Sequence, residues 1–140
     1  YSIFWAKLKI WAPLKILGFT EWNLKNGEYS KPELLPSRVN HGRRSAQLDP
    51  CIAPDESYLL FSCKRHNTQR DIYISFRQSD ETYTEDFNLS EALHTNGGEL
   101  FTTLSIDDKY LLFIRCVASG NEDVMWVSSD VIDKLREDHL

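Results

Sequence analysis

Arginine and histidine, the side chains most suited to binding an anionic partner, gather in a few stretches of the sequence that we predict to be loops. These residues are Arg38, His41, Arg43 and Arg44, then Arg65, His66 and Arg70, and finally His94. Arginine binds carboxylates through two parallel hydrogen bonds, and binding residues concentrate on loops that a rigid scaffold positions. We therefore expect a protein partner or a small anionic ligand here, most directly at His41, Arg43, Arg44, Arg65, His66 and His94. Solvated loop charge is the alternative interpretation.

Catalytic and cofactor motifs are absent from the sequence. It contains no G-x-S-x-G, no H-E-x-x-H, no Walker loop and no dinucleotide-binding fingerprint. Paired carboxylates are a possible general acid and base, but the acidic clusters fall in predicted turns, where solvated charge is expected. These clusters are Glu81, Glu85 and Asp86, Asp107 and Asp108, and Glu122 and Asp123. We expect no catalytic residue, no metal and no cofactor.

Cysteine, tryptophan and one sequon complete the chemically notable residues. Three cysteines, Cys51, Cys63 and Cys116, leave at least one unpaired within a monomer, and we expect all three to be small buried hydrophobic residues. The tryptophans are interpreted as packing residues: Trp5, Trp11, Trp22 and Trp126. The sequence 88–90 (NLS) is a glycosylation sequon, which has meaning only in a eukaryotic secreted chain.

The composition is that of one folded domain. The 140 residues are 41% hydrophobic and 12% aromatic, which argues against disorder. The net charge of −5 argues against binding to nucleic acid or to an anionic membrane. Lysines and Pro13 interrupt the apolar stretch 1–24, so no membrane insertion is expected. The chain starts at Tyr1 without a signal-peptide pattern, so we expect a removed segment or an excised piece of a longer protein.

An internal repeat is the strongest feature of the sequence. Residues 58–64 read YLLFSCK and residues 110–116 read YLLFIRC, an offset of 52 that also places 71–75 onto 123–127. A third copy begins at 1–7, YSIFWAK, at an offset of 57 from 58–64. Further landmarks repeat at an offset of 54: 26–30 with 80–84, Leu35 with Leu89, and Val39 with Leu93.

Each copy consists of short runs of β-branched, aromatic and leucine residues separated by turn residues, which predicts strands. In the middle copy the predicted strands are Pro50–Ala53, Tyr58–Lys64, Asp71–Arg77 and Asp86–Leu89. The run 58–61 is apolar at consecutive positions, which is typical of a strand covered on both faces. Antiparallel four-stranded units with this period indicate β-propeller blades, with an ordinary β-sandwich as the alternative.

The residues of the two best copies also resemble a known family. The sequences APDESYLLFSC and DIYISF, then SIDDKYLLFIR and DVMWVSS, resemble the TolB-like class of WD-like propeller repeats. Glu56 and Asp108 replace the glycine usual in the family's turn, Ile106 replaces its proline, and residues 8–19 fit the pattern poorly. The resemblance implies a larger propeller, a periplasmic or extracellular location, and a role as a binding scaffold or attached domain.

Dividing the length by the repeat period predicts about two and a half blades, too few to close a ring. The expected divisions are a partial blade at 1–36, a full blade at 50–89, a last blade lacking its outer strand at 100–128, and a terminal helix at 130–138 with Asp130 as its N-cap. We therefore expect the C-terminal part of a longer propeller, or a piece that must assemble, and ring closure requires the remainder of the propeller.

Alternating strand direction divides the loops between two ends of each blade. Connections after second and fourth strands carry the basic and histidine residues, whereas connections after first and third strands carry acidic turns. A non-catalytic binding or scaffold module is the function we predict. The alternatives are the propeller portion of a hydrolase or peptidase whose catalytic residues lie outside this chain, and a remnant reading frame.

Overall fold

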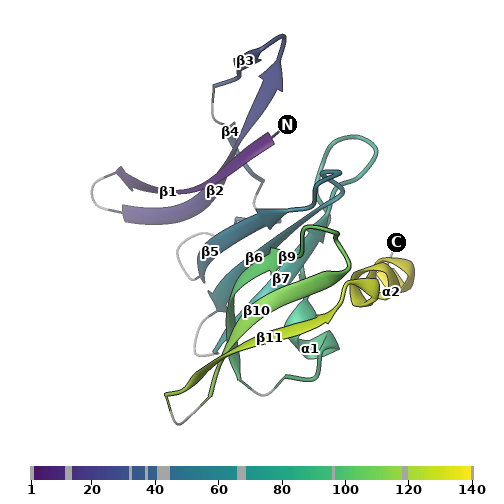
Figure 1. Ribbon diagram of the computed structural model, residues 1–140. Coiled ribbons are helices and arrows are strands. Elements are labelled where there is room, and N and C mark those ends of the chain that lie inside the picture. Colours follow the sequence, from purple (N-terminus) through teal and green to yellow (C-terminus); the bar gives the residue numbers. More distant parts are fainter. Residues whose placement is uncertain are drawn as a thin grey trace.

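The computed structural model describes residues 2–11, 14–31, 33–36, 38–40, 45–65, 69–95, 97–117 and 120–139, with backbone alone for 2–11, 14–18 and 20–25. Within these ranges the chain forms antiparallel β-sheets followed by a short C-terminal helix, which confirms the predicted all-β class. The sheets are stacked, with the middle one between the other two (Figure 1). None of the helices in the described ranges has the length and apolarity needed to cross a bilayer.

The first sheet is built on a long hairpin. Strand β1 (Ser2–Trp11) pairs with β2 (Leu14–Lys25), and β2 also pairs with the short strands β3 (Glu28–Tyr29) and β4 (Glu33–Leu34). Asn26 and Gly27 join β2 to β3 with positive φ angles of 53° and 82°, the conformation that an Asn-Gly hairpin turn adopts. Residues 8–19, which fit the repeat poorly in sequence, belong to strands over 8–11 and 14–19.

The middle sheet has four strands where the sequence predicts them, in the order β5-β6-β7-β8, except that β5 begins at Ser45, five residues before the predicted start at Pro50. Their bounds are β5 (Ser45–Ile52), β6 (Tyr58–Arg65), β7 (Arg70–Phe76) and β8 (Phe87–Asn88). A short helix, α1 (Leu89–Ala92), follows β8. Asn88 caps α1, because its side-chain oxygen accepts a hydrogen bond from the backbone N–H of Glu91.

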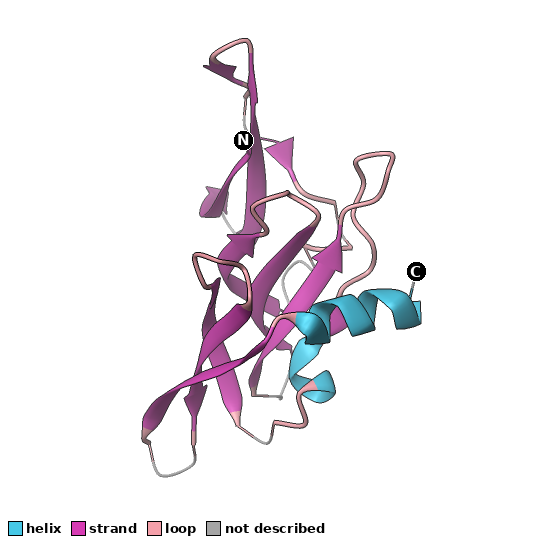
Figure 2. Cartoon of the chain, turned by 45° about the vertical axis from the view of Figure 1, so that its right-hand side comes forward, coloured by secondary structure: helices cyan, strands magenta, loops and turns pink. Residues whose placement is uncertain are grey.

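The third sheet has the order β11-β10-β9 and leads into α2. Its strands are β9 (Gly98–Leu104), β10 (Tyr110–Cys116) and β11 (Glu122–Ser128). Helix α2 is Asp130–His139. The sequence predicts Asp130 as the N-cap that precedes the helix, whereas in the structure Asp130 is the first residue of the helix. Figure 2 shows α1 and α2 on the same side of the sheets.

The middle and third sheets repeat the same backbone irregularities at the offset of 52. A register shift interrupts β5 between Leu48 and Cys51, and an equivalent shift in β9 lies opposite Leu112–Ile114. Positive φ angles occur at Asp49 (55°) and Phe101 (52°) in these shifts. The β5–β6 and β9–β10 turns likewise place Glu56 (60°) and Asp108 (58°) in the left-handed region. That conformation favours glycine, so Glu56 and Asp108 occupy positions where glycine would be least strained.

Two apolar clusters cover the opposite faces of the middle sheet. One contains Leu59, Phe61, Cys63, Tyr73 and Tyr83 and packs against Phe19, Leu35 and Val39 of the first sheet and its following loop. The other contains Leu60, Ile72, Ile74, Phe76 and Leu89 and packs against Leu111, Phe113 and Ile132. Strand β6 therefore sends alternate side chains into two different interfaces, as its consecutive apolar run predicts.

Helix α2 ties the third sheet to the middle one. Ile132 is 1% exposed within the second cluster. The Arg136 guanidinium donates a hydrogen bond to Ser57 Oγ at 3.1 Å and lies 5.1 Å from the centre of the Phe76 ring. The His139 ring stacks on Phe87 at 4.4 Å between centroids. The helix thus covers the end of the β6–β7 pair where β6 begins and β7 ends, next to the β5–β6 turn.

Candidate functional site

The strand registers place the starts of β5 and β9 beside the ends of β6 and β10, at one end of the middle and third sheets. Ser45 at the start of β5 pairs with Arg65 at the end of β6, and Gly98 at the start of β9 pairs with Cys116 at the end of β10. The Gly98 backbone also lies close to the Arg70 carbonyl, since a Cβ added at Gly98 would be 3.4 Å from that oxygen. The strand registers therefore place Arg65 and Arg70 at the same end of the middle sheet.

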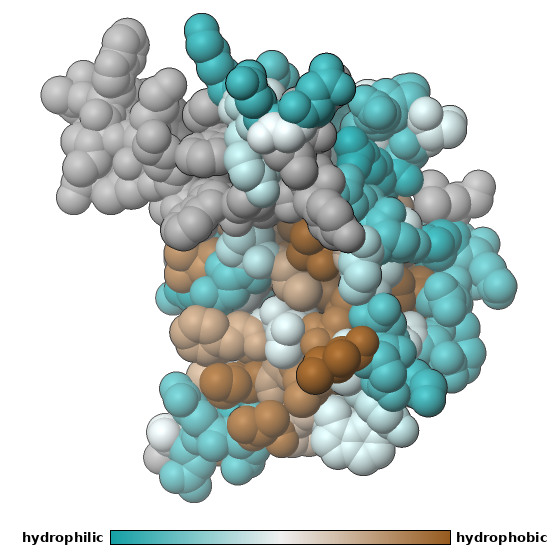
Figure 3. Space-filling model, turned by 45° about the horizontal axis from the view of Figure 1, so that its top comes forward, coloured by the Kyte–Doolittle hydropathy of each residue, from teal (hydrophilic) through white to brown (hydrophobic). Residues whose placement is uncertain are grey.

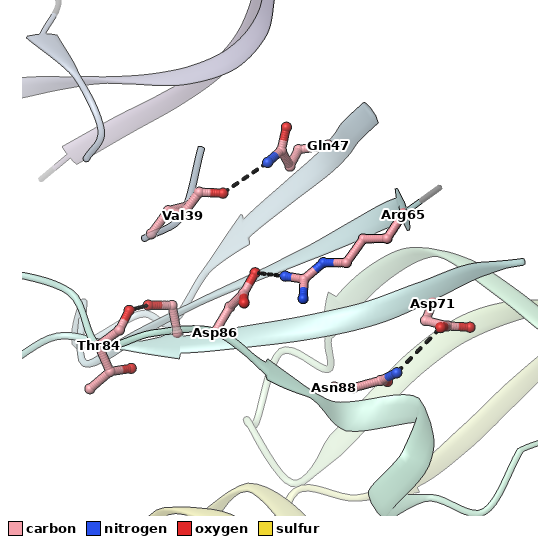
Figure 4. Close-up of polar contacts among 8 residues, drawn as sticks. Val39, Gln47, Arg65, Asp71, Thr84, Asp86 and Asn88 are labelled. Atoms are coloured by element: carbon pink, nitrogen blue, oxygen red, sulfur yellow. Dashed lines mark hydrogen bonds and ion pairs between the residues drawn. The ribbon is translucent and has the colours of Figure 1, made fainter. Parts of the chain in front are cut away.

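Arg65 is fixed at this end by neighbouring residues. Its guanidinium forms an ion pair with Asp86, whose side chain is 3% exposed (Figure 4). The same guanidinium lies 4.0 Å from the centre of the Tyr73 ring. Arg65 therefore stabilises the β6–β7–β8 side of the middle sheet. Nearby, Arg38 pairs with Glu85 at 3.6 Å, with both side chains more than half exposed.

The remaining predicted partner-binding residues are only partly described. His94 is exposed just after α1 and has a positive φ of 52°. His41, Arg43, Arg44 and His66 lie outside the described residues. The described part of the predicted surface thus comprises Arg38, Arg65, Arg70 and His94, of which Arg38 and Arg65 have carboxylate partners within the chain.

A second polar feature, which the residue pattern did not single out, lies where each sheet meets the preceding one. Gln47 on β5 is fully buried, and its amide donates a hydrogen bond to the Val39 carbonyl at 2.9 Å (Figure 4). Glu99, at the equivalent position of β9, is also fully buried. The repeat offset of 52 was the signal that links these two positions.

Glu99 is an unusual carboxylate because it is fully buried. The Arg115 guanidinium lies opposite it, with Nε 3.9 Å from Glu99 Oε1. Burial raises the pKa of the Glu99 carboxyl, whereas the Ser90 and Thr95 hydroxyls and Arg115 lower it by less, and Asp71 adds a further upward effect. The Glu99 side chain is therefore a titratable group inside the interface between the middle and third sheets.

The acidic turns have structural roles at the opposite end. Asp80 accepts hydrogen bonds from the Thr82 hydroxyl at 2.6 Å and the Thr82 backbone N–H at 3.0 Å, and these bonds hold the pKa of Asp80 below its usual range. Asp107 accepts a hydrogen bond from the Ser105 hydroxyl at 2.7 Å, which lowers its pKa in the same way. Among the described residues no group of three or more His, Cys, Asp or Glu side chains is placed to bind a metal ion.

The remaining chemically notable residues are the cysteines, the sequon and the tryptophans. All three cysteines are free; Cys63 is buried as predicted, whereas Cys51 and Cys116 are only partly buried. Asn88 and Ser90 of the sequon are used internally, because Asn88 caps α1 and Ser90 Oγ accepts a hydrogen bond from the Ile72 backbone N–H. Trp126, predicted to pack between sheets, is 67% exposed. The side chains of Trp5, Trp11 and Trp22 lie outside the described residues.

A shallow groove of about 300 Å³ lies on the third sheet, lined by Ser105, Tyr110, Leu112 and Trp126. The Tyr110 and Trp126 rings meet edge to face, with their centroids 5.1 Å apart. These lining residues are mainly apolar, so the groove is suited to packing against an apolar surface.

Comparison of the sequence with protein-family models finds no match, and comparison with curated proteins finds no significant similarity.

Proposed function

We propose that this chain is a non-catalytic binding or scaffold module of the β-propeller type, whose successive sheets are TolB-like blades within a larger ring. The observation that supports this most strongly is the middle sheet, which is buried on both faces by sheets that share its repeat. Stacked repeats of this kind contact only their neighbours and present their loops for binding. A periplasmic or extracellular location is part of the same proposal.

The binding surface of the proposal is the loop end that carries the arginine and histidine residues. Because Arg65 is engaged with Asp86 and Tyr73, we assign the partner contacts to other residues of the predicted set, with Arg43 and Arg44 foremost. The proposed partner is an anionic ligand or an acidic protein surface, because arginine binds the carboxylates of such a partner through two parallel hydrogen bonds.

Charge reversal at this end tests the proposal. An acidic peptide, poly-glutamate, is titrated onto the chain at low salt and binding is measured by fluorescence anisotropy. We expect the double variant Arg43→Glu/Arg44→Glu to lose binding, while Lys109→Glu, an exposed charge change in the β9–β10 turn at the opposite end, retains it. Equal binding by both variants, or no binding by the wild-type chain, would overturn the assignment of this surface.

A further inference from the structure

The third sheet has one face packed against the middle sheet and one face open to solvent. Leu111 and Phe113 point into the second cluster, so the alternate residues of β10 point away from it. On the open side Val124 is 72% and Trp126 67% exposed. Apolar side chains also gather over this part of the molecule in the space-filling view (Figure 3). We call Leu112, Ile114, Val124 and Trp126 the outer face.

The strand register makes the outer face continuous. Leu112 lies opposite Trp126, and Ile114 lies opposite Val124, across the β10–β11 pair. Tyr110 flanks Trp126 at the end of the groove. A contiguous exposed apolar patch on a sheet is typical of an interaction surface.

The repeat identifies what this surface is built to contact. At the offset of 52, Leu112 corresponds to Leu60, Val124 to Ile72 and Trp126 to Ile74. All three middle-sheet residues are fully buried, in the cluster that packs against the third sheet. The outer face therefore occupies the repeat positions that, one copy earlier, contact the next sheet.

The covering surface is also defined by the interface already present. The third sheet covers the middle one with Leu111 and Phe113, and the middle sheet presents their equivalents, Leu59 and Phe61, to the first sheet. Tyr110, which lines the groove on the third sheet, corresponds to Tyr58 on the middle sheet. Tyr58 is already covered, because the Arg136 guanidinium of α2 lies 5.9 Å from the centre of its ring. A matching partner thus carries Leu and Phe two positions apart on one strand.

We propose that the outer face binds a further antiparallel β-sheet of this same repeat, one that presents a Leu-x-Phe face like that of Leu111 and Phe113. This inference rests on the proposed stacking of blade-like sheets, and it assigns the residues at which the stack continues. The partner is specified by its chemistry, an apolar sheet face rather than a charged loop or a nucleic acid.

A second copy of the chain serves as the probe, because its first sheet begins another copy of the repeat, in which Ser2 and Phe4 stand at the positions of Leu59 and Phe61 at the offset of 57. Sedimentation equilibrium is run from low micromolar to near-millimolar concentration. We expect the average mass of the wild-type chain to rise with concentration, and that of the Trp126→Asp variant to stay at the monomer value. Val124→Asp is a second, independent variant, and circular dichroism confirms that both retain the wild-type melting transition. Ile106→Asp is the matched control, because Ile106 is fully exposed in the β9–β10 turn and is not one of the outer-face residues.

A wild-type chain that stays monomeric throughout, or folded Trp126→Asp and Val124→Asp variants that associate as the wild type does, would overturn the inference. Poly-glutamate binding is measured on the same variants. Loss of that binding only in Arg43→Glu/Arg44→Glu, together with loss of association only in the outer-face variants, separates the failure of one proposal from the failure of the other.

Discussion

Gln47 and Glu99 show how one position of the repeat is used with two different chemistries. Both are fully buried on the first strand of their sheets, but Gln47 donates to a backbone carbonyl whereas a carboxylate has no proton to donate. The residues opposite them differ in parallel: Cys63 faces Gln47, and Arg115 faces Glu99. The third sheet has thus replaced a neutral pair by an ionisable one at the same place.

This difference predicts a pH dependence of stability. Because burial raises the pKa of Glu99 above its ordinary value of 4.5, the folded state binds more protons than the unfolded state just above that pH. The stabilisation of the folded state that comes from this shift is therefore fully present below pH 4.5, and it is lost as the pH rises through the pKa of Glu99 in the folded state. We expect the Glu99→Gln variant to lose this decline, so its unfolding free energy relative to wild type increases as the pH rises from 4.5 through the pKa of Glu99 in the folded state.

Urea unfolding across this pH range measures the effect. Glu137→Gln, which removes an exposed carboxylate of α2, is the control and should follow the wild-type profile. The charged groups that act on Glu99 are Asp71 from β7 and Arg115 from β10, and both are unchanged in the two variants. Parallel pH profiles for wild type and Glu99→Gln would contradict this account.

At the scale of elements, α2 supplies the link between two sheets. Its Ile132 side chain lies in the cluster formed by β6, β7 and β10, and Arg136 reaches Ser57 in the β5–β6 turn. The helix begins directly after β11, with Ser129 Oγ donating to the Asp108 carbonyl at 2.7 Å. Its docking therefore fixes the orientation of the third sheet against the middle one.

Truncation of the buried residue tests this role. We expect Ile132→Ala to lower the free energy of unfolding by about 2–5 kcal/mol, the usual effect of deleting a buried aliphatic side chain. Lys134→Ala, on the exposed side of the same helix, should change it by less than about 0.5 kcal/mol. Chemical denaturation of the two variants makes the comparison, and equal effects would mean that α2 does not dock as described.

The elements of the middle sheet were predictable from sequence, whereas those of the first sheet were less so. Turn residues at Pro54 and Asp55 and dense apolar runs mark β6 and β7, and the structure places these strands within a residue of the prediction. Residues 8–19 contain two lysines in an otherwise mainly apolar stretch and fit the repeat poorly, so their pairing as a long hairpin was not evident. Strand pairing, rather than repeat similarity, determines that region.

The candidate site was predictable only in its topology. Alternating strand direction correctly brings the ends of β6 and β10 to the same end as the starts of β5 and β9. The ion pair of Arg65 with Asp86 was not predictable, because it joins residues 21 apart in sequence through the fold of the β7–β8 connection. The role of Glu99 likewise required knowledge of which side of β9 is buried.

For the whole molecule, the organising feature is a stack in which the middle sheet is shielded on both faces. The first and third sheets each cover one of its clusters, while the third sheet leaves Val124 and Trp126 exposed. In a stack of repeats, protection against opening depends on neighbours on both sides. The middle strands should therefore be the last to open.

Native-state hydrogen exchange of the 140-residue chain tests this organisation most directly. We expect the backbone amides of β6 and β7 to exchange most slowly, at the rate set by global unfolding, and those of β11 to exchange measurably faster. The measurement is made at low protein concentration, where association through the outer face is minimal. Amides of β11 that exchange as slowly as those of β6, or β6 amides that exchange quickly, would contradict a stack centred on the middle sheet.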